Sequence, residues 1–164
     1  MKKFALAAAT ALLLATTAHA GELSFPSDAP VATITIPDSW NPKETETGID
    51  ATSDDNSIYL AVDVADAKDT DAVVKDAVEY LAGQGVTVDQ ASAKQTAGML
   101  NGMVLTNVNW DGTDKDGPVT IGLAAAAANA EKVLVITYWG TKGEQEKNDA
   151  AMTDIVQSLK PVAQ

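Results

Sequence analysis

Residues 132–140 predict a β-strand that is apolar on both faces. The segment is rich in β-branched and aromatic residues, and Gly140 ends it. The two-residue period of a strand divides its side chains into one face with Val133, Val135, Thr137 and Trp139 and another with Leu134, Ile136 and Tyr138. Because a strand is apolar on both faces only where both are covered, this pattern predicts a central strand in a layered α+β domain.

Shorter segments with the pattern of strands precede it. Residues 31–37 alternate threonine with alanine or isoleucine, which predicts a half-buried strand, whereas residues 21–30 predict polar surface chain. Residues 48–52 and 57–64 flank a turn-forming segment and predict a hairpin. In the second of these strands Ile58, Leu60 and Val62 share one face, and Tyr59 and Asp63 fall on the other.

The later half of the chain predicts a series of neighbouring strands. Residues 86–97 are polar enough for an edge strand, and residues 103–110 and 118–127 predict a hairpin around a loop at 111–117. The alanines at 124–128 favour helix by propensity, but the run is too short for an isolated helix. We therefore expect these alanines to lie in the strand that returns toward residues 132–140.

Two segments have the 3.6-residue period of amphipathic helices. The segment 66–84 has its apolar stripe at Val73, Val74, Ala77, Val78 and Leu81. A second helix is expected to start near residues 141–144, where Thr141 and Glu144 have the spacing of a capping box, and to end before Pro161. Its stripe comprises Ala151, Met152, Ile155, Val156 and Leu159. Both stripes need a sheet to pack on, so the expected fold is an α/β/α sandwich around a mainly antiparallel sheet.

The N-terminus has the three parts of a secretory signal peptide. Lys2 and Lys3 precede a short apolar run, and Ala18-His19-Ala20 offers a small-x-small cleavage site. The run is shorter than the ~20 apolar residues of a membrane-spanning helix. We therefore expect cleavage after Ala20, a single domain over residues 21–164 with no membrane span, and a periplasmic location.

Composition narrows the functional classes. The chain of 164 residues has a net charge of −12, and removing the leader with its two lysines changes this to −14. Such an acidic domain is a poor partner for nucleic acid, whose binding depends on neutralising phosphates. Every basic side chain is a lysine, there is no cysteine, and the only histidine, His19, lies in the leader. The mature domain thus lacks the usual general base, thiolate nucleophile and bidentate anion clamp, and we expect no cofactor.

Three carboxylates in the segment 111–117 form the candidate metal site. Asp111, Asp114 and Asp116 lie in a glycine-bearing loop that could surround a hard cation. Aligning Gly117 with the central glycine of an EF-hand loop leaves Gly112 and Leu123 at the first and last ligand positions. A plain polar hairpin loop remains the alternative.

Trp40 and Trp110 are the candidate ligand-contacting aromatics, since an indole ring can stack on a ligand. The alternative for Trp40 is that it caps one end of the core. No Gly-x-Ser-x-Gly, Ser-x-x-Lys or Walker sequence occurs. Acids are numerous enough that no pair of carboxylates stands out as a glycosidase site.

Several short sequences, taken in order, resemble PsbP-like domains. They are Ile36-Pro37-Asp38-Ser39-Trp40 after a strand, Gly98-x-x-x-Gly102 before a long hairpin, Tyr138-Trp139-Gly140, and the last helix closing on residues 154–159. That superfamily includes the extrinsic subunit of photosystem II, a Ran-binding nuclear-import factor and periplasmic DcrB-like domains. The resemblance implies an α/β/α sandwich used as a non-catalytic accessory or binding module. The chain departs from photosynthetic members in lacking a mature histidine, and from lipoprotein members in lacking a cysteine.

These observations favour an exported, non-enzymatic accessory domain that binds a protein partner at the cell envelope. The alternative is a binder of a small molecule or cation, with a pocket rimmed by Trp40, Trp110 or Trp139 and nearby acids. A hydrolase that uses Asp, Glu or Lys side chains is the third hypothesis.

Overall fold

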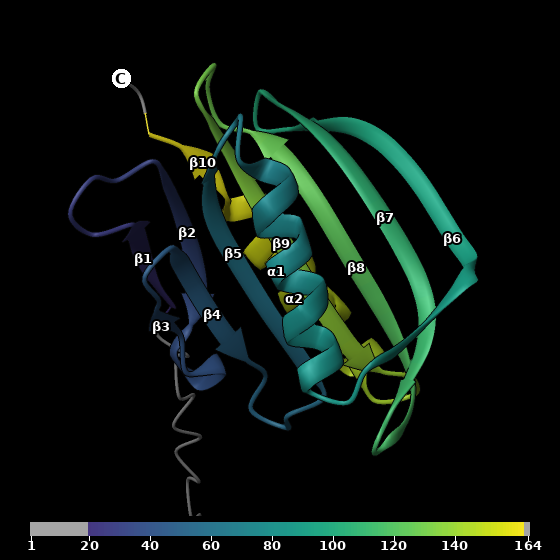
Figure 1. The fold of residues 1–164 in the computed structure, drawn as a ribbon. Coiled ribbons are helices and arrows are strands. Elements are labelled where there is room, and N and C mark those ends of the chain that lie inside the picture. The colour runs from purple at the N-terminus through teal and green to yellow at the C-terminus, as the bar shows by residue number, and fades with distance from the viewer. Residues whose placement is uncertain (1–19, 163–164) are drawn as a thin grey trace, which may run out of the picture.

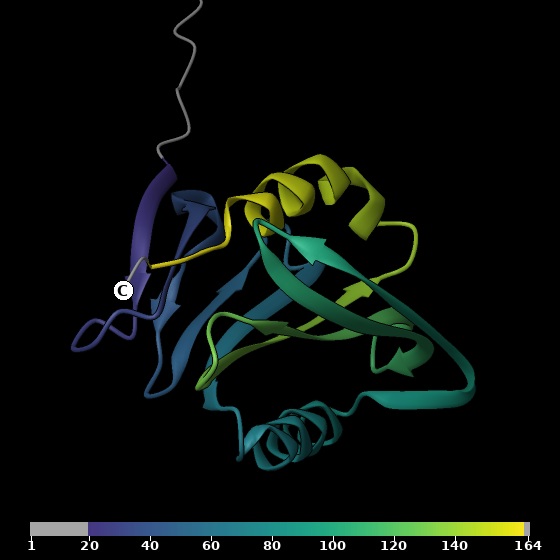
Figure 2. The same cartoon turned by 90° about the horizontal axis from the view of Figure 1, so that it is seen from above.

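A curved seven-stranded sheet lies between two helices, one on each face (Figures 1 and 2). The computed structural model describes residues 20–162. All neighbouring strands of this sheet are antiparallel, in the order β3-β4-β5-β9-β8-β7-β6. Their bounds are β3 Lys43–Glu44, β4 Gly48–Thr52, β5 Ile58–Asp66, β6 Thr87–Leu100, β7 Met103–Asp114, β8 Gly117–Ala127 and β9 Lys132–Thr141. The predicted α+β class and antiparallel sheet are confirmed.

Strand β9 is the central strand that its two apolar faces predict. It pairs with β5 over residues 132–140 on one side and with β8 on the other, and Leu134 and Val135 are both fully buried. The alanines of 124–127 lie in β8 as expected. Small side chains suit this strand because Tyr138 of β9 lies over Gly122 of β8, where a methyl group would overlap its ring.

A second sheet of three antiparallel strands closes one side of the molecule. Its order is β1-β2-β10, with β1 Ala20–Phe25, β2 Ala32–Pro37 and β10 Lys160–Pro161. The alternation predicted for β2 is confirmed, since Ala32, Ile34 and Ile36 are buried. The expectation of surface chain over 21–30 is wrong for its first half. Residues 20–25 pair with β2, and the buried Phe25 gives them an apolar attachment to the core.

The two helices are α1 Thr70–Gly83 and α2 Asp149–Ser158, and they lie on opposite faces of the seven-stranded sheet (Figure 2). A short 3-10 segment, Gln145–Asn148, leads into α2. The predicted capping box at 141–144 is wrong. Thr141 is still part of β9, where it pairs with Val119, and the residue before α2 is Asn148. The strand therefore includes Thr141, which the capping pattern assigned to the helix start, and residues 142–144 form a turn.

The two faces of the sheet are covered unequally. The larger apolar core lies on the α2 side and extends to the second sheet, and it contains the buried Trp40, Leu134, Ile155 and Leu159. On the α1 side a smaller buried cluster comprises Leu81, Val86, Val119 and Ile121. In the predicted stripe of α1 only Leu81 is buried, and Val78 is 46% exposed. Helix α1 thus covers its part of the sheet loosely, which leaves room for a groove.

No helix in residues 20–162 is long and apolar enough to cross a membrane. The predicted signal peptide lies outside the described residues except for Ala20, which begins β1.

Candidate functional site

The candidate site is a groove between α1 and the neighbouring strands β4, β5 and β9, hereafter the α1 groove. Strand alternation decides which side chains reach it. Tyr59, Ala61 and Asp63 of β5 lie on the α1 side, opposite Trp139, Thr137 and Val135 of β9. Helix α1 contributes Val73, Asp76, Ala77 and Tyr80 from the other wall.

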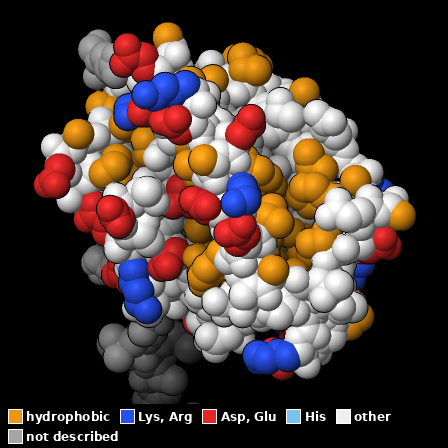
Figure 3. Space-filling model, in the orientation of Figure 1, with side chains coloured by type: hydrophobic (Ala, Val, Ile, Leu, Met, Phe, Trp, Pro, Cys, Tyr) orange, Lys and Arg blue, Asp and Glu red, His pale blue; other side chains and the backbone are white. Residues whose placement is uncertain are grey.

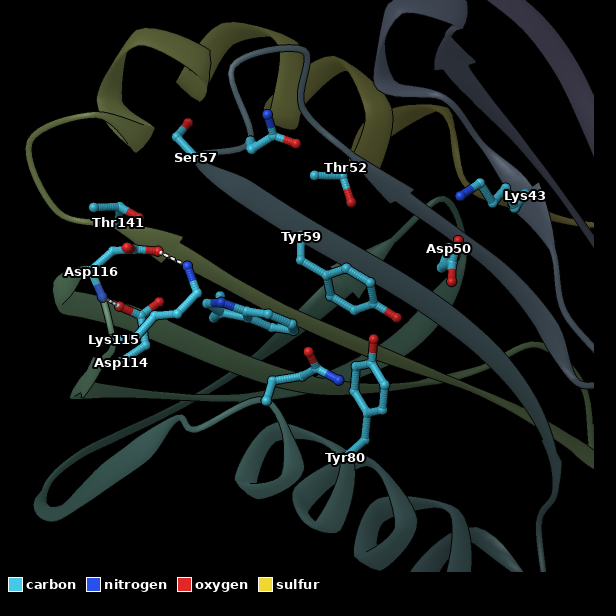
Figure 4. Close-up of a pocket in the computed structure, with 13 residues that line it drawn as sticks. Lys43, Asp50, Thr52, Ser57, Tyr59, Tyr80, Asp114, Lys115, Asp116 and Thr141 are labelled. Atoms are coloured by element: carbon cyan, nitrogen blue, oxygen red, sulfur yellow. Dashed lines mark hydrogen bonds and ion pairs between the residues drawn. The ribbon is translucent and has the colours of Figure 1, made fainter.

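Two hollows form the α1 groove, and Asp50, Tyr59 and Tyr80 line both of them. The first, the hairpin end, has a volume of about 420 Å³ and extends to the β7–β8 turn (Figure 4). Besides the shared residues it is lined by Lys43, Thr52, Asn56, Ser57, Gln84, Asp114, Lys115, Asp116, Trp139 and Thr141. The second, the Asp63 end, has a volume of about 370 Å³. Its other lining residues are Thr45, Glu46, Thr47, Ala61, Asp63, Val73, Asp76, Ala77 and Thr137.

An aromatic cluster separates these hollows. The Tyr59 ring lies 4.5 Å from that of Trp139 and 5.6 Å from that of Tyr80, measured between ring centroids. Because Tyr59 and Trp139 are opposite each other on β5 and β9 while Tyr80 comes from α1, the cluster joins the helix to the sheet. Tyr80 is 44% exposed, so a ring face remains accessible from solvent. Burial raises the pKa of Tyr59 well above its usual range, so this phenol stays neutral at physiological pH.

Carboxylates dominate the charge of the groove. Glu46, Asp50, Asp63 and Asp76 line the Asp63 end, and Figure 3 shows acidic side chains gathered on and beside α1 on this face. Asp63 is the most deeply placed, and its burial raises the pKa of its carboxyl, with Asp50 adding to the effect. A hydrogen bond from the Thr47 hydroxyl, at 2.6 Å, acts in the opposite direction. A negative charge at Asp63 is therefore only partly compensated by the protein.

Thr137 supplies an unused polar group at the bottom of the Asp63 end. Its side chain is 2% exposed, and its Oγ1 has no hydrogen-bond partner among the described residues. Ala61 of β5 is its direct cross-strand neighbour, and Ala77 of α1 lines the same hollow. Thr137, Ala61 and Ala77 thus line one hollow, and the Thr137 hydroxyl is buried beside it. Buried hydroxyls are normally hydrogen-bonded, so this one calls for an explanation.

The predicted metal loop is not brought together by the fold. Asp111 and Asp114 lie in strand β7 rather than in a loop, and their odd spacing directs them to opposite faces of the sheet. The Asp111 carboxylate binds Lys142 at 2.7 Å, and Asp114 accepts the backbone amides of Asp116 and Gly117 in the turn. Within residues 20–162 no three His, Cys, Asp or Glu side chains are gathered as a metal ion would require.

The two tryptophans chosen from the sequence do not line the groove. Trp40 is 2% exposed and packs in the larger core, so the hypothesis that it contacts a ligand is wrong and the core alternative holds. Trp110 is half-buried against the cluster around Leu81, and its buried Nε1 has no partner among the described residues. Trp139, the third tryptophan considered, does line the hairpin end.

Sequence reasoning missed Tyr59, Asp63, Tyr80 and Thr137 as parts of one site. The sequence did contain one signal for this site. On the face of β5 opposite Ile58, Leu60 and Val62, the polar side chains of Tyr59 and Asp63 interrupt an otherwise apolar strand. Their partners come from α1 and β9, and only the long-range pairing of β5 with β9 brings these segments together.

Comparisons with known proteins give the fold. No family model and no curated protein sequence matches the chain. The solution structure of cyanobacterial PsbP (CyanoP) from Synechocystis sp. superposes with a TM-score of 0.61 at 10% identity, over 93% of this chain and 98% of that one. The crystal structure of LpqN, which is involved in cell envelope biogenesis of Mycobacterium tuberculosis, gives 0.55 at 15% identity, over 88% and 92%. The fold of this chain is therefore that of PsbP-like proteins, as its short motifs predict.

Proposed function

We propose that this protein is an exported, non-enzymatic binding domain of the cell envelope that docks a basic segment of a protein partner in the α1 groove. The observation that carries the proposal is the combination of a partly exposed aromatic cluster with incompletely compensated carboxylates in one groove. Lysine and arginine side chains are attracted to both kinds of group.

The charge distribution supports a basic partner. Six carboxylates line the two hollows, at Glu46, Asp50, Asp63, Asp76, Asp114 and Asp116, against two lysines, Lys43 and Lys115. Lys115 is paired with Asp116 at 2.6 Å. A groove lined mainly by one sign of charge raises the local concentration of ligands of the opposite sign.

The leader pattern at residues 1–20 supports an envelope location. The mature chain contains no cysteine, so it has no thiol that an oxidising compartment would modify. Expression with the native leader in a Gram-negative host tests this point. We expect the protein in the osmotic-shock fraction with the mass of residues 21–164. Retention of residues 1–20, or a cytoplasmic location, would contradict export.

Site-specific photocrosslinking tests the groove as the partner surface. A photoreactive residue at Gln84, which lines the hairpin end, is expected to capture a defined envelope protein. The matched probe at Gln95, on the exposed edge strand β6, is expected to capture none of it. Equal capture from both positions would contradict the proposed surface.

Charge reversal provides the second arm. Asp76→Lys places a lysine in the groove, whereas Asp154→Lys makes the same change on the exposed side of α2, across the sheet. We expect the first variant to reduce crosslinking from position 84 at least about tenfold and the second to leave it unchanged. A basic partner also predicts weaker capture as salt is raised, because salt screens exposed charges.

A further inference from the structure

We infer that the Asp63 end of the α1 groove is a binding pocket for a primary alkylammonium group, with Asp63 and Thr137 as its two oxygen ligands. The inference rests on the proposed function and gives the chemical class that the groove selects. The same chemistry occurs in a lysine side chain of a protein and in a free aliphatic amine.

The first step is the spacing of the two oxygen-bearing side chains. Asp63 is opposite Val135, and Thr137 is two residues farther along β9 on the same face. The Cα atoms of such diagonal neighbours in an antiparallel pair are about 7–8 Å apart, and their Cβ atoms are somewhat closer. An ammonium nitrogen that donates hydrogen bonds of about 2.8 Å can join two oxygens that lie up to roughly 5.6 Å apart, which side chains at this spacing can reach.

The second step is the donor and acceptor balance. An ammonium has three donors and no acceptor, and a carboxylate has about four lone-pair sites. Thr47 occupies one site on Asp63, and the Thr137 Oγ1 is buried without a partner in the described structure. A bound ammonium would satisfy the Thr137 oxygen and add a third contact to the ring of Tyr59 or Tyr80.

The third step excludes other ligands. Four carboxylates at this end oppose an anion. A hard metal cation needs several oxygens gathered at one point, and residues 20–162 contain no such group of acids.

The walls of the pocket fit the alkyl stem of such a ligand. Ala61, Val73 and Ala77 are apolar and line the same hollow as Asp63. They would cover the methylene groups while the charged end reaches Asp63, as lysine stems are covered on protein surfaces. The volume of about 370 Å³ accommodates a chain of this size.

Calorimetric titration of the mature domain tests the pocket with four named probes. These are n-butylammonium, 1,5-diaminopentane, a blocked pentaglycine peptide with a central lysine, and the same peptide with norleucine. We expect the amines or the lysine peptide to bind and the norleucine peptide not to bind. Binding of the lysine peptide alone identifies a protein side chain as the source, whereas tighter binding of the free amines identifies a small molecule. No binding of any amine at 20 mM overturns the inference.

Three variants assign the binding to this pocket. Asp63→Asn retains the shape and removes the charge, and we expect roughly 10- to 100-fold weaker binding. Thr137→Val is expected to weaken it roughly 3- to 10-fold. Ala77→Leu fills the hollow without changing any charge and is expected to abolish binding, whereas Ala82→Leu, an exposed position on the other side of α1, leaves it unchanged.

Unchanged amine binding in both Asp63→Asn and Ala77→Leu would overturn the assignment. The outcome is separable from that of the proposed function. Loss of amine binding in these variants while crosslinking from position 84 persists would show a partner surface at the hairpin end alone. Persistence of amine binding in the absence of any captured protein would retain the pocket and reject the protein partner.

Discussion

Replacing Thr137 by valine is expected to stabilise the ligand-free protein. The hydroxyl is 2% exposed and has no partner among the described residues. Burying a hydroxyl without a hydrogen bond costs about 1–3 kcal/mol by mutational measurements. Valine has the same shape and the same preference for strands, so the substitution removes this cost without creating a cavity. The free energy of unfolding should rise by about 1–3 kcal/mol, which is roughly 3 to 12 °C in Tm for a domain of this size.

Thr120→Val is the matched control on the adjacent strand β8. The Thr120 hydroxyl accepts a hydrogen bond from Gln145 Nε2 at 3.0 Å, so the same substitution removes a bond there. It should lower the free energy of unfolding by about 0.5–1.5 kcal/mol. Urea unfolding followed by circular dichroism measures both variants. If Thr137→Val destabilises the protein as Thr120→Val does, the Thr137 hydroxyl already has a partner and is not available to a ligand.

Three further predictions concern other residues. Because burial raises the pKa of Asp63, the stability of the wild type should fall as pH rises from about 4 through that raised pKa. Asp63→Asn should be more stable than the wild type at pH 7 and equally stable at pH 3. Hydrogen bonds from Ser53 and the Ser57 amide hold the pKa of Asp55 well below its usual range, so Asp55→Asn should be less stable than the wild type at pH 7. This difference should shrink as pH falls below about 4. Asp54→Asn, at an exposed neighbouring position, is the control, and an equal loss of stability there would refute the role of Asp55. Gly122→Ala should cost about 1–3 kcal/mol in urea unfolding, because its methyl group overlaps the Tyr138 ring, and a neutral result would refute that packing.

The strands of the main sheet could be predicted because their signal is local. Two apolar faces over 132–140 and turn residues at 53–56 determine the role of β9 and the β4–β5 hairpin without reference to distant residues. The helix start at 141–144 could not be predicted in this way. The capping-box spacing is present, but Thr141 remains in the strand because it pairs with Val119 and its backbone N–H donates a hydrogen bond to the Ser57 carbonyl. Tertiary pairing overrides the local helix signal.

The candidate site was beyond sequence reasoning for a related reason. Its residues lie on three elements that are far apart in the chain, and neither Ala61 nor Ala77 has any feature of a site by itself. Only the pairing of β5 with β9 and the packing of α1 bring these alanines to the same hollow as the unpartnered Thr137 hydroxyl. The acids at Asp111 and Asp114 were attractive because they are close in sequence, but in a strand a spacing of three residues places them on opposite faces.

The retention of Asp63 at a site where its charge is costly is the reason to regard the groove as functional. Apolar or neutral residues at buried positions generally give greater stability, and proteins tend to keep a destabilising group where activity needs it. The raised pKa of Asp63 and the unpartnered Thr137 hydroxyl lie in the same hollow, so one bound cation would relieve both.

Mapping amide chemical shifts during titration with the central-lysine peptide tests the binding groove most directly. The account predicts shifts concentrated on Tyr59, Asp63, Ala77, Tyr80 and Thr137, saturating with peptide and absent with the norleucine peptide. Shifts concentrated instead on the exposed β6–β7 part of the sheet, or none at saturating amine concentrations, would contradict it.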